Sequence, residues 1–243
     1  MRIIKLNAIG STNHFLKELS SQESCENFTV VSTEFQTDGK GQRGSGWLSE
    51  VGNNLTFSVL YNQKLKEFSS LFTLNIIVGL SIVEALQLVS DLNFFIKWPN
   101  DILAENKKIG GILIENTFKN SNDVQSIIGI GLNINQSQFE NLPQASSLFL
   151  LENKFFYREA ILVSIINKLE HNLNQLPILG ETYFWDLYHS FLFKKEVVST
   201  FESVDGNRFV GKIKEVTRDG KLAVLQEDDS IHFYDIKEIK MLY

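Results

Sequence analysis

Six runs rich in β-branched and aromatic residues lie within the first 134 residues of this chain, and they strongly limit the folds that it can adopt. Runs of this composition are typical of β-strands. They cover residues 3–6, 28–35, 54–61, 94–98, 109–115 and 124–134. Helical patterns lie between some of them: Ser11 or Thr12 can cap a short amphipathic helix, and a long apolar helix is expected at about 68–89. The pattern predicts an α+β fold in which helices flank one mixed β-sheet.

The pattern changes twice in the second half of the chain. After Ser147, apolar residues follow a helical spacing at about 157–173 and 182–190. From about Lys194 onward, short strand-like runs alternate with turn signals, as in a small β-barrel. The turn signals lie at 205–207, 219–220 and 228–229. We therefore expect two domains, residues 1–192 and residues 193–243.

Composition excludes several classes of protein. The chain has 23 basic and 29 acidic residues and a net charge of -6, so it offers no broad positive surface for a nucleic-acid backbone. The single cysteine, Cys25, excludes an intramolecular disulfide and suggests no metal site. The apolar stretch 72–89 is interrupted by polar residues, which favours a buried helix over a membrane span. No secretion signal is visible at the start, so we expect a cytoplasmic protein that binds neither DNA nor membranes.

A glycine-rich segment, residues 36–47 with the sequence QTDGKGQRGSGW, is the densest chemical signal. Four glycines in eight positions let the backbone approach a ligand closely, and Lys40 and Arg43 add positive charge to an acidic protein. The segment is neither a Walker loop nor a dinucleotide fingerprint, because the required lysine spacing and the following helix are absent. It therefore reads as an anion-binding loop of another kind, although such a segment can also be a flexible connector.

Three further motifs follow the loop. Residues 97–101, KWPND, place a lysine, an amide and a carboxylate around a rigid proline at the end of a strand. Residues 107–111, KKIGG, open another strand with two small residues, against which something is expected to pack closely. Residues 129–135, GIGLNIN, have a similar character.

The order and spacing of these motifs resemble the biotin protein ligases. The resemblance covers essentially the whole chain and includes Ser11-Thr12-Asn13 near the start and residues 145–148, ASSL, after the sheet. It implies a biotin/lipoate ligase-like catalytic domain followed by a small barrel of the Src-homology-3 type. Some members also carry an N-terminal winged helix that binds operator DNA. This chain begins at the first catalytic strand, so we expect no repressor role.

The resemblance also implies a role for individual residues. Lys97 and Asp101 are the expected catalytic residues, with Lys97 between the biotin carboxylate and the α-phosphate of ATP. The expected biotin-binding residues are Ser11, Thr12, Asn13, Gln36, Gly39, Lys40, Gly41, Gln42, Trp47, Gly111 and Gly131. The expected ATP- and adenylate-binding residues are Lys40, Gln42, Arg43, Trp47, Lys97, Asn100 and Asn133. Mg²⁺ is expected with ATP; oxygens of Asn100 or Asp101 are conceivable ligands, but no metal ligand is assigned.

The implied reaction has two steps. The biotin carboxylate attacks the α-phosphorus of ATP to give biotinyl-adenylate and pyrophosphate, and a lysine amine of a biotin carboxyl carrier protein then displaces AMP. A free lysine amine has a pKa of about 10.4, so the second step needs local deprotonation, for which Asp101 is the expected base. A homodimer paired through sheet edges is compatible with this interpretation.

The glycine-rich loop departs from the pattern of the family at three positions. Lys40 and Gln42 stand where many members have arginine, and Ser45 stands where a further arginine is frequent. Lysine lacks the two-pronged hydrogen bonding of arginine, and glutamine carries no charge. A missing arginine contact to the adenylate phosphate costs roughly 1.5 to 3 kcal/mol. We therefore expect faster release of biotinyl-adenylate than from arginine-bearing relatives.

Three other interpretations compete with this one. A lipoate or octanoate protein ligase shares the related fold, but those families favour a loop with a histidine, and His14, His171, His189 and His232 all lie outside this loop. A non-catalytic biotin-sensing or protein-binding module is the second alternative, and the lysine at position 97 argues against it. A hydrolase is the third, and no serine, histidine and acid combination with a supporting turn supports it.

Overall fold

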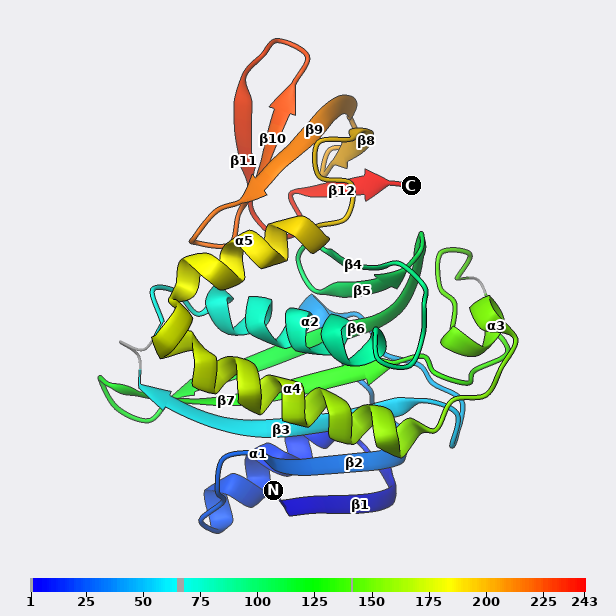
Figure 1. The fold of residues 1–243 in the computed structure, drawn as a ribbon, viewed down its shortest axis with the longest axis vertical. Helices are drawn as coiled ribbons and strands as arrows, with labels where there is room; N and C mark the ends of the chain where they lie inside the picture. Colours follow the sequence, from blue (N-terminus) through cyan, green and yellow to red (C-terminus); the bar gives the residue numbers. More distant parts are fainter. Residues whose placement is uncertain (1, 65–67, 141) are drawn as a thin grey trace.

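A mixed seven-stranded sheet with helices on both faces forms the larger part of the molecule (Figure 1). The structure is a computed structural model, and it describes residues 2–64, 68–140 and 142–243 except for the side chain of Arg43. A second, antiparallel sheet lies beyond the first along the long axis. The elements of the larger part are β1 (Arg2–Ile9), α1 (Thr12–Gln22), β2 (Thr29–Gln36), the short 3₁₀ helix η1 (Gln42–Gly44), β3 (Leu55–Lys64), α2 (Phe72–Leu86), β4 (Phe94–Lys97), β5 (Asp101–Ala104), β6 (Lys107–Phe118), β7 (Asp123–Leu132), α3 (Leu148–Glu152), α4 (Arg158–Leu179) and α5 (Glu181–Phe191). The second sheet contains β8 (Val198–Ser203), β9 (Arg208–Val216), β10 (Leu222–Gln226), β11 (Ile231–Tyr234) and β12 (Ile239–Leu242).

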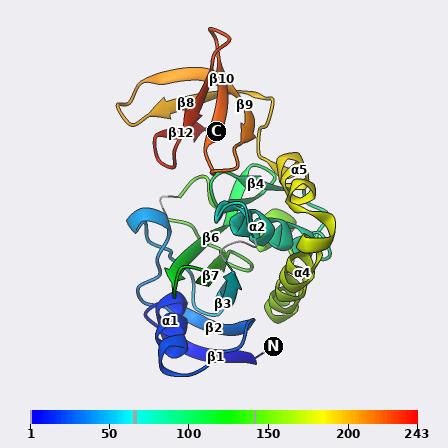
Figure 2. The ribbon, with the colours of Figure 1, turned by 90° about the vertical axis from the view of Figure 1, so that its left-hand side faces the viewer.

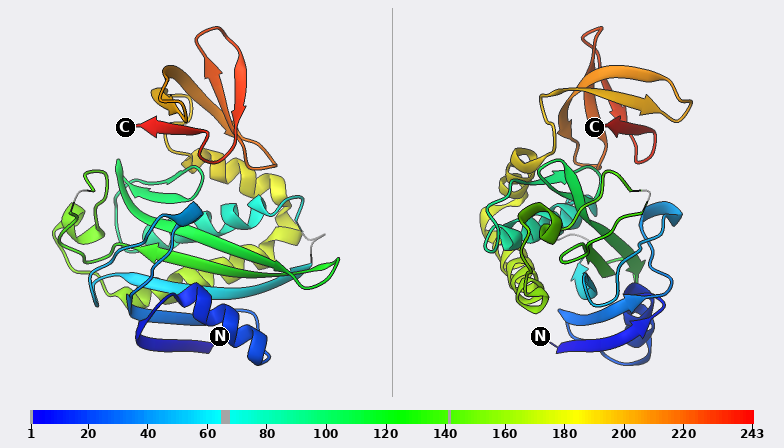
Figure 3. Two further views of the ribbon diagram at one scale, coloured as in Figure 1. Left: turned by 180° about the vertical axis from the view of Figure 1, so that it is seen from behind. Right: turned by 90° about the vertical axis from the view of Figure 1, so that its right-hand side faces the viewer.

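The strand order of the large sheet is β1-β2-β3-β7-β6-β5-β4, with β1 and β2 parallel and every other neighbouring pair antiparallel. Alternate residues of its strands face opposite sides. Val30 and Val59 belong to the main core cluster, which includes α2 and α4, whereas Val31 and Leu60 pack with Leu16 of α1. Helices α2 and α4 therefore cover one face and α1 covers the other, as Figure 3 shows from the side.

Helix α2 is buried on nearly all sides between the sheet, α4 and α5, which explains its unbroken apolar character. Three of the polar residues that interrupt this stretch, Asn75, Ser81 and Glu84, pair inside the protein, because buried polar groups need partners. Asn172 of α4 donates to Ser81 Oγ at 3.1 Å and to Glu84 Oε2 at 3.2 Å. Asn75 donates to the backbone oxygen of Pro99 at 2.8 Å. None of the described helices is long and apolar enough to cross a membrane.

The second sheet has the order β11-β10-β9-β8-β12 and stands over α5 and the β4–β5 hairpin (Figure 2). Its turn between β9 and β10 reaches the large sheet: Trp98 Nε1 donates to the backbone oxygen of Gly220 at 2.9 Å. Gly220 has φ +90° and lies against the ring of Phe72, where a Cβ would come within 2.9 Å of the ring. A residue other than glycine would strain this turn.

The predicted elements agree well with the observed ones. Each of the six predicted strand runs corresponds to a strand, and the helices predicted at about 157–173 and 182–190 correspond to α4 and α5. The apolar helix is shorter than the predicted 68–89, since it begins at Phe72 and ends at Leu86. Strand β5 was not predicted, because its four residues follow the turn at Pro99 directly and carry no alternation long enough to read.

His189 of α5 gives the contact between this helix and the second sheet a predicted pH dependence. Its unprotonated Nε2 accepts the backbone N–H of Val216 at 3.0 Å, and the backbone oxygen of Val216 lies 3.1 Å from the same nitrogen. Burial lowers the pKa of His189 below its ordinary 6.5 and outweighs the opposing effect of the Val216 oxygen. This contribution to folding is therefore present above that pH and is lost as the pH falls through the lower pKa of the folded state. His189→Gln keeps an acceptor but cannot titrate. On acidification, we expect its melting temperature to fall by about 2–4 °C less than that of the wild type.

Thermal melts between pH 7.5 and 5.0 measure this effect. The matched control is His171→Gln on the exposed surface of α4, which should melt like the wild type at every pH. An equal fall in melting temperature for wild type and His189→Gln would contradict the assignment.

Candidate functional site

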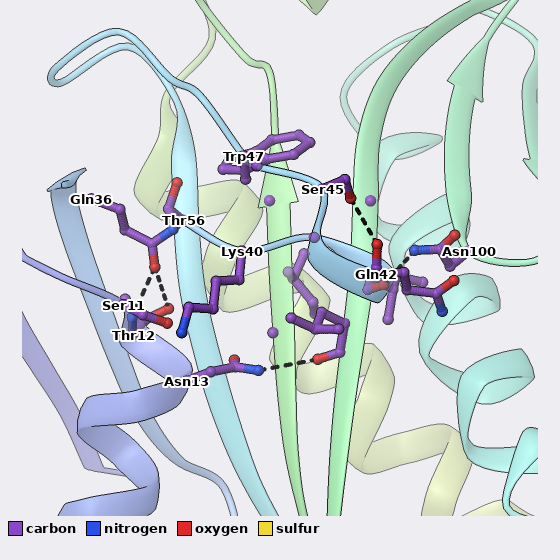
Figure 4. Close-up of a pocket in the computed structure, with 18 of the residues that line it drawn as sticks. Ser11, Thr12, Asn13, Gln36, Lys40, Gln42, Ser45, Trp47, Thr56 and Asn100 are labelled. Atoms are coloured by element: carbon purple, nitrogen blue, oxygen red, sulfur yellow. Dashed lines mark hydrogen bonds between the residues drawn. The ribbon is translucent and has the colours of Figure 1, made fainter. Parts of the chain in front are cut away.

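A cavity of about 120 Å³ opens at the edge of the large sheet where its strands begin and end, beneath the glycine-rich loop (Figure 4). Strands β1 and β2 are parallel and end at this edge, so the start of α1 and the loop after β2 meet there. The following strands are antiparallel, and this places the start of β3, the end of β7 and the start of β6 at the same edge. The topology thus gathers motifs that are far apart in the sequence.

Most of the residues predicted to bind ligands line this cavity. They are Ser11, Thr12, Asn13, Gln36, Lys40, Gly41, Gln42, Trp47, Asn100, Asp101, Gly111 and Gly131. In Figure 4, Thr12, Asn13 and Gln36 lie on one side, Gln42 and Asn100 lie on the other, and Lys40 lies between them. Three predicted residues, Gly39, Lys97 and Asn133, do not line it, and the side chain of Arg43 lies outside the described part of the chain.

A chain of hydrogen bonds forms the deep end of the cavity. Thr12 donates its backbone N–H and its hydroxyl to Gln36 Oε1 at 2.8 and 3.1 Å. The hydroxyl of Ser58 lies 2.8 Å from Thr12 Oγ1 and 2.6 Å from Asn13 Oδ1. Asn13 in turn donates Nδ2 to Glu115 Oε2 at 2.7 Å. Because each partner fixes the next, these groups hold one set of donor and acceptor directions.

Ser58 and Glu115 were not predicted as site residues. Ser58 is fully buried on β3 beneath Thr12 and Asn13, and Glu115 lies on β6. Ser58 is a small polar residue among the apolar residues of its strand, and that interruption is the signal that could have revealed it. Ser11 has a different position, because its side chain caps α1 by accepting the N–H of His14 at 3.4 Å.

The glycine-rich loop closes on itself as a narrow hairpin. Trp47 N–H donates to Gly39 O at 2.8 Å, and Gly41 N–H donates to Ser45 O at 2.7 Å. A Cβ on Gly39 would lie 2.3 Å from the backbone oxygen of Trp47, so a larger residue there would break this closure. Gly39 therefore contributes to the site by closing the loop, without lining the cavity.

Trp47 lies over the glycine-bearing strands. Gly111 of β6 and Gly131 of β7 are paired across the sheet and present a surface without side chains. The indole rests on it, since a Cβ on Gly131 would come within 2.4 Å of the ring. Its Nε1 is buried and has no hydrogen-bond partner within the described residues. The indole is thus an apolar wall with one unused donor.

The 97–101 turn is anchored from three directions. Asn75 of α2 holds the backbone of Pro99, and Gly220 of the second sheet holds the indole of Trp98, as described above. Asn100 donates Nδ2 to Ile112 O at 2.7 Å, which ties the turn to β6. The turn therefore joins both sheets and α2, which explains why its residues keep a fixed position.

Lys97 ends β4 opposite Asp101 of β5 and projects into a second cavity, of about 420 Å³, between the two sheets. Its Nζ lies 3.6 Å from Asp101 Oδ2, and Lys108 Nζ lies 2.6 Å from Asp101 Oδ1. Burial lowers the pKa of Lys97, and the Asp101 carboxylate partly opposes this shift. Gln42, Ser45 and Asn100 line both cavities, so Lys97 stands next to the first cavity across a shared wall.

Asn133 lies just after β7 with its side chain buried. Its Nδ2 donates to Ser146 O at 3.1 Å, and its Oδ1 has no partner within the described residues. A buried, unused acceptor of this kind suits a ligand that brings an N–H donor.

Comparison with known proteins decides the family. The model of the biotin/lipoate A/B protein ligase family matches residues 6–133, which are more than half of the chain. The chain belongs to this family. The match contains the glycine-rich loop, the 97–101 turn and Gly131, the residues that carried the resemblance in the sequence.

Individual members of the biotin/lipoate A/B protein ligase family are similar over different lengths. The bifunctional ligase/repressor BirA of Escherichia coli (strain K12) is 32% identical over 139 residues, which are 56% of this chain and 41% of that protein. The biotin--[acetyl-CoA-carboxylase] ligase of Mycobacterium tuberculosis is 29% identical over 169 residues, which are 68% of this chain and 62% of that protein. The matched regions thus span less than two thirds of either relative.

A solved structure is similar over nearly the full length. The biotin protein ligase from Aquifex aeolicus in complex with biotin and ATP superposes with a TM-score of 0.82 at 28% identity. The superposition covers 99% of this chain and 98% of that chain, so it includes the second sheet as well as the first.

Proposed function

We propose that this family member is an ATP-dependent biotin protein ligase that forms biotinyl-adenylate and transfers biotin to a lysine of a biotin carboxyl carrier protein. The observation that carries the proposal is the pairing of two environments: a cavity with a hydrogen-bonded polar end and, across a shared wall, a lysine whose side chain is largely covered. A ligand with a polar ring at one end and a carboxylate at the other fits this pair. Biotin has that chemistry, with its ureido ring and its valerate.

The polar end also favours biotin over lipoate. The ureido ring of biotin has two N–H donors and one acceptor, whereas the dithiolane of lipoate has none. A site built from hydroxyl, amide and carboxamide groups leaves those groups unpaired when an apolar ring enters, and such a mismatch is costly. The Thr12, Asn13 and Gln36 arrangement therefore supports a ureido-binding role and disfavours the lipoate alternative.

The other roles follow from the positions of the residues. Lys97 would meet the biotin carboxylate and the α-phosphate, where negative charge accumulates during attack. Lys40 and Gln42, on the loop that closes the cavity, would contact the phosphate and the biotin chain, with Gly41, Gly111 and Gly131 leaving room for the ligand. Trp47 would cover the ring systems, and the unused Oδ1 of Asn133 would accept a hydrogen bond from the adenine amino group. Asp101 would hold Lys97 and act as the base toward the incoming lysine amine.

Mg²⁺ would accompany ATP, bound to its phosphates. Within the described residues, no group of three or more His, Cys, Asp or Glu residues could hold a metal. A magnesium ion bound mainly by phosphate oxygens and water needs only one or two protein carboxylates, and Asp101 is a carboxylate lining the cavity. Such an ion offsets the phosphate charge.

The second sheet would be a small barrel of the Src-homology-3 type, and the chain would divide between residues 192 and 193. The end of α5 at Phe191 and the start of the five antiparallel strands at Val198 support this division. The contact of the Gly220 turn with Trp98 supports a role for this part in completing the site.

ATP-dependent incorporation of labelled biotin into a biotin carboxyl carrier domain tests the proposal. We expect incorporation that requires ATP and is not reduced by an excess of lipoate. Incorporation of lipoate in place of biotin would transfer the chain to the lipoate branch of the family. Binding of biotin without release of pyrophosphate from ATP would instead indicate a non-catalytic module.

The absence of arginine at position 42 predicts rapid dissociation of biotinyl-adenylate from the protein. The side chain of Gln42 faces both cavities, while its backbone oxygen accepts from Ser45, so the side chain can change without opening the turn. We expect Gln42→Arg to slow dissociation of biotinyl-adenylate by about tenfold to a hundredfold, because a charged hydrogen bond to phosphate is restored. Release of labelled adenylate in a chase experiment measures this rate. Gln42→Met is the matched control, and equal release from the arginine variant and the wild type would contradict the expectation.

A further inference from the structure

The aromatic ring of Tyr243, which follows β12 of the second sheet, lies against the ammonium group of Lys97. The distance from Lys97 Nζ to the ring centroid is 5.3 Å, within the range of a cation–π contact. Tyr243 is held by two further segments: its ring meets that of Phe193 edge-on at 5.3 Å, and Gln144 donates Nε2 to its backbone oxygen. The ring is therefore fixed in place and does not rest on Lys97 by chance.

Lys97 needs such a partner because its charged neighbours do little to stabilise the positive charge of its ammonium group. The facing groups are Asp101 of β5, Lys108 of β6, and Lys240 and Tyr243 of the second sheet. Asp101 makes its shorter contact with Lys108, at 2.6 Å, and lies 3.6 Å from Lys97. Glu202 and Lys237 also line the cavity that contains Lys97. Burial and the neighbouring Lys108 and Lys240 lower the pKa of Lys97, whereas the shared Asp101 carboxylate and the ring of Tyr243 favour its charged form.

The hydroxyl of Tyr243 is unsuited to proton transfer at neutral pH. Burial, together with the nearby charge of Asp101, raises the pKa of Tyr243 to about 12. The phenol thus stays protonated, and the useful part of the side chain is the ring face. This distinguishes a positioning residue, which acts through Lys97, from a catalytic residue.

We propose that Tyr243 is a positioning residue for adenylate formation, whose ring holds the Lys97 ammonium group at the wall between the two cavities. The inference rests on the proposed function, because it assigns the contact to the reaction in which Lys97 would take part. It also gives the second sheet a role in the reaction that acts through Lys97, since the residue after its last strand contacts the ammonium group of this lysine.

A series of three variants tests this contact. Tyr243→Phe keeps the ring, Tyr243→Leu keeps an apolar side chain without the ring, and Phe233→Leu is a control at an exposed position on edge strand β11. We expect biotin-dependent ATP–pyrophosphate exchange to be unchanged in Tyr243→Phe and in the control. In Tyr243→Leu, we expect it to fall by about fivefold to thirtyfold, since a desolvated cation–π contact is lost.

The pH profile separates this role from a purely structural one. Loss of the ring destabilises only the charged form of Lys97, so the alkaline limb of the exchange reaction should move to lower pH by about one unit in Tyr243→Leu. A loosened fold would lower the rate at every pH and would leave the limb unmoved. Exchange in Tyr243→Leu equal to the wild type, or a loss in Tyr243→Phe as large as in Tyr243→Leu, would overturn the proposal.

A second readout does not depend on the activity. The rate at which an amine-directed reagent modifies Lys97, followed by peptide mass spectrometry across a pH range, reports the pKa of this lysine directly. The pH of half-maximal modification should be lower in Tyr243→Leu than in Tyr243→Phe and the wild type. An unchanged value in Tyr243→Leu refutes the contact even if exchange falls in that variant. Absence of exchange in the wild type, with the shift in modification present, would reject the proposed function and leave the contact standing.

Discussion

Replacing Lys97 with methionine is expected to lower biotin-dependent ATP–pyrophosphate exchange by about a hundredfold to a thousandfold, the usual effect of removing one buried group that stabilises developing charge. Methionine keeps the length and most of the packing of the side chain. The negative charge of the carboxylate and of the phosphate would then meet without a positive group between them, while Asp101 would retain its contact with Lys108. The fold should therefore persist, and the loss should lie in the rate of adenylate formation.

Lys107→Met is the matched control for this prediction. Lys107 lies on β6 one residue before Lys108, but its ammonium group is on the surface and donates to the backbone oxygen of Pro143 at 2.7 Å. Exchange in this variant should equal that of the wild type. Near-normal exchange in Lys97→Met, with a folded protein by thermal melting, would remove Lys97 from the reaction and with it the proposed mechanism.

The fold was largely predictable from the sequence, because its strands and helices are long enough to show their periodicity. The exceptions have a common cause. Strand β5 and helix α3 are four and five residues long, which leaves too few periods of their repeats to read, and β5 lacks the aromatic residues that made the equally short β4 visible. The mixed character of the sheet was predicted, but the order of its strands depends on pairings between distant segments, which no local pattern encodes.

The candidate site was predictable where its residues lie in motifs and unpredictable where they do not. The glycine-rich loop and the 97–101 turn combine backbone constraints with charge, and such combinations are visible in one sequence. Ser58, Glu115 and Tyr243 are single residues within ordinary strands or at their ends, and only the fold brings them to the motifs. The second cavity was equally invisible, because its walls come from both sheets.

Two motifs of the site are completed by isolated residues behind them. Thr12 and Asn13 are supported by Ser58, Asn13 by Glu115, and Lys97 by Tyr243. Thr12 and Asn13 begin helix α1 and Lys97 ends strand β4, and a side chain at the end of an element needs a partner to hold one direction. A change in a supporting residue should therefore impair the site in the same way as a change in the ligand-facing residue that it holds.

Gly129→Ala is expected to raise the KM for biotin by about thirtyfold to a thousandfold, because it breaks such a support. Gly129 lies on β7 beneath Asn13, and a Cβ there would come within 2.4 Å of Asn13 Oδ1. The Asn13 carboxamide would have to turn away, which gives up its contacts with Ser58 at 2.6 Å and with Glu115 at 2.7 Å. The latter is a hydrogen bond to a carboxylate and is the more costly of the two.

The separation of the two ends of the site makes this prediction specific. Gly129 lines the first cavity but not the second, and it is not among the residues of the wall that they share, so the KM for ATP and the rate at saturating biotin should change far less than the KM for biotin. Gly10→Ala is the matched control, since its Cβ would meet nothing within 4 Å although the residue directly precedes Ser11. A rise in the KM for ATP equal to that for biotin would mean that the alanine disturbs the whole sheet edge, and the biotin head would then have to lie elsewhere in the cavity.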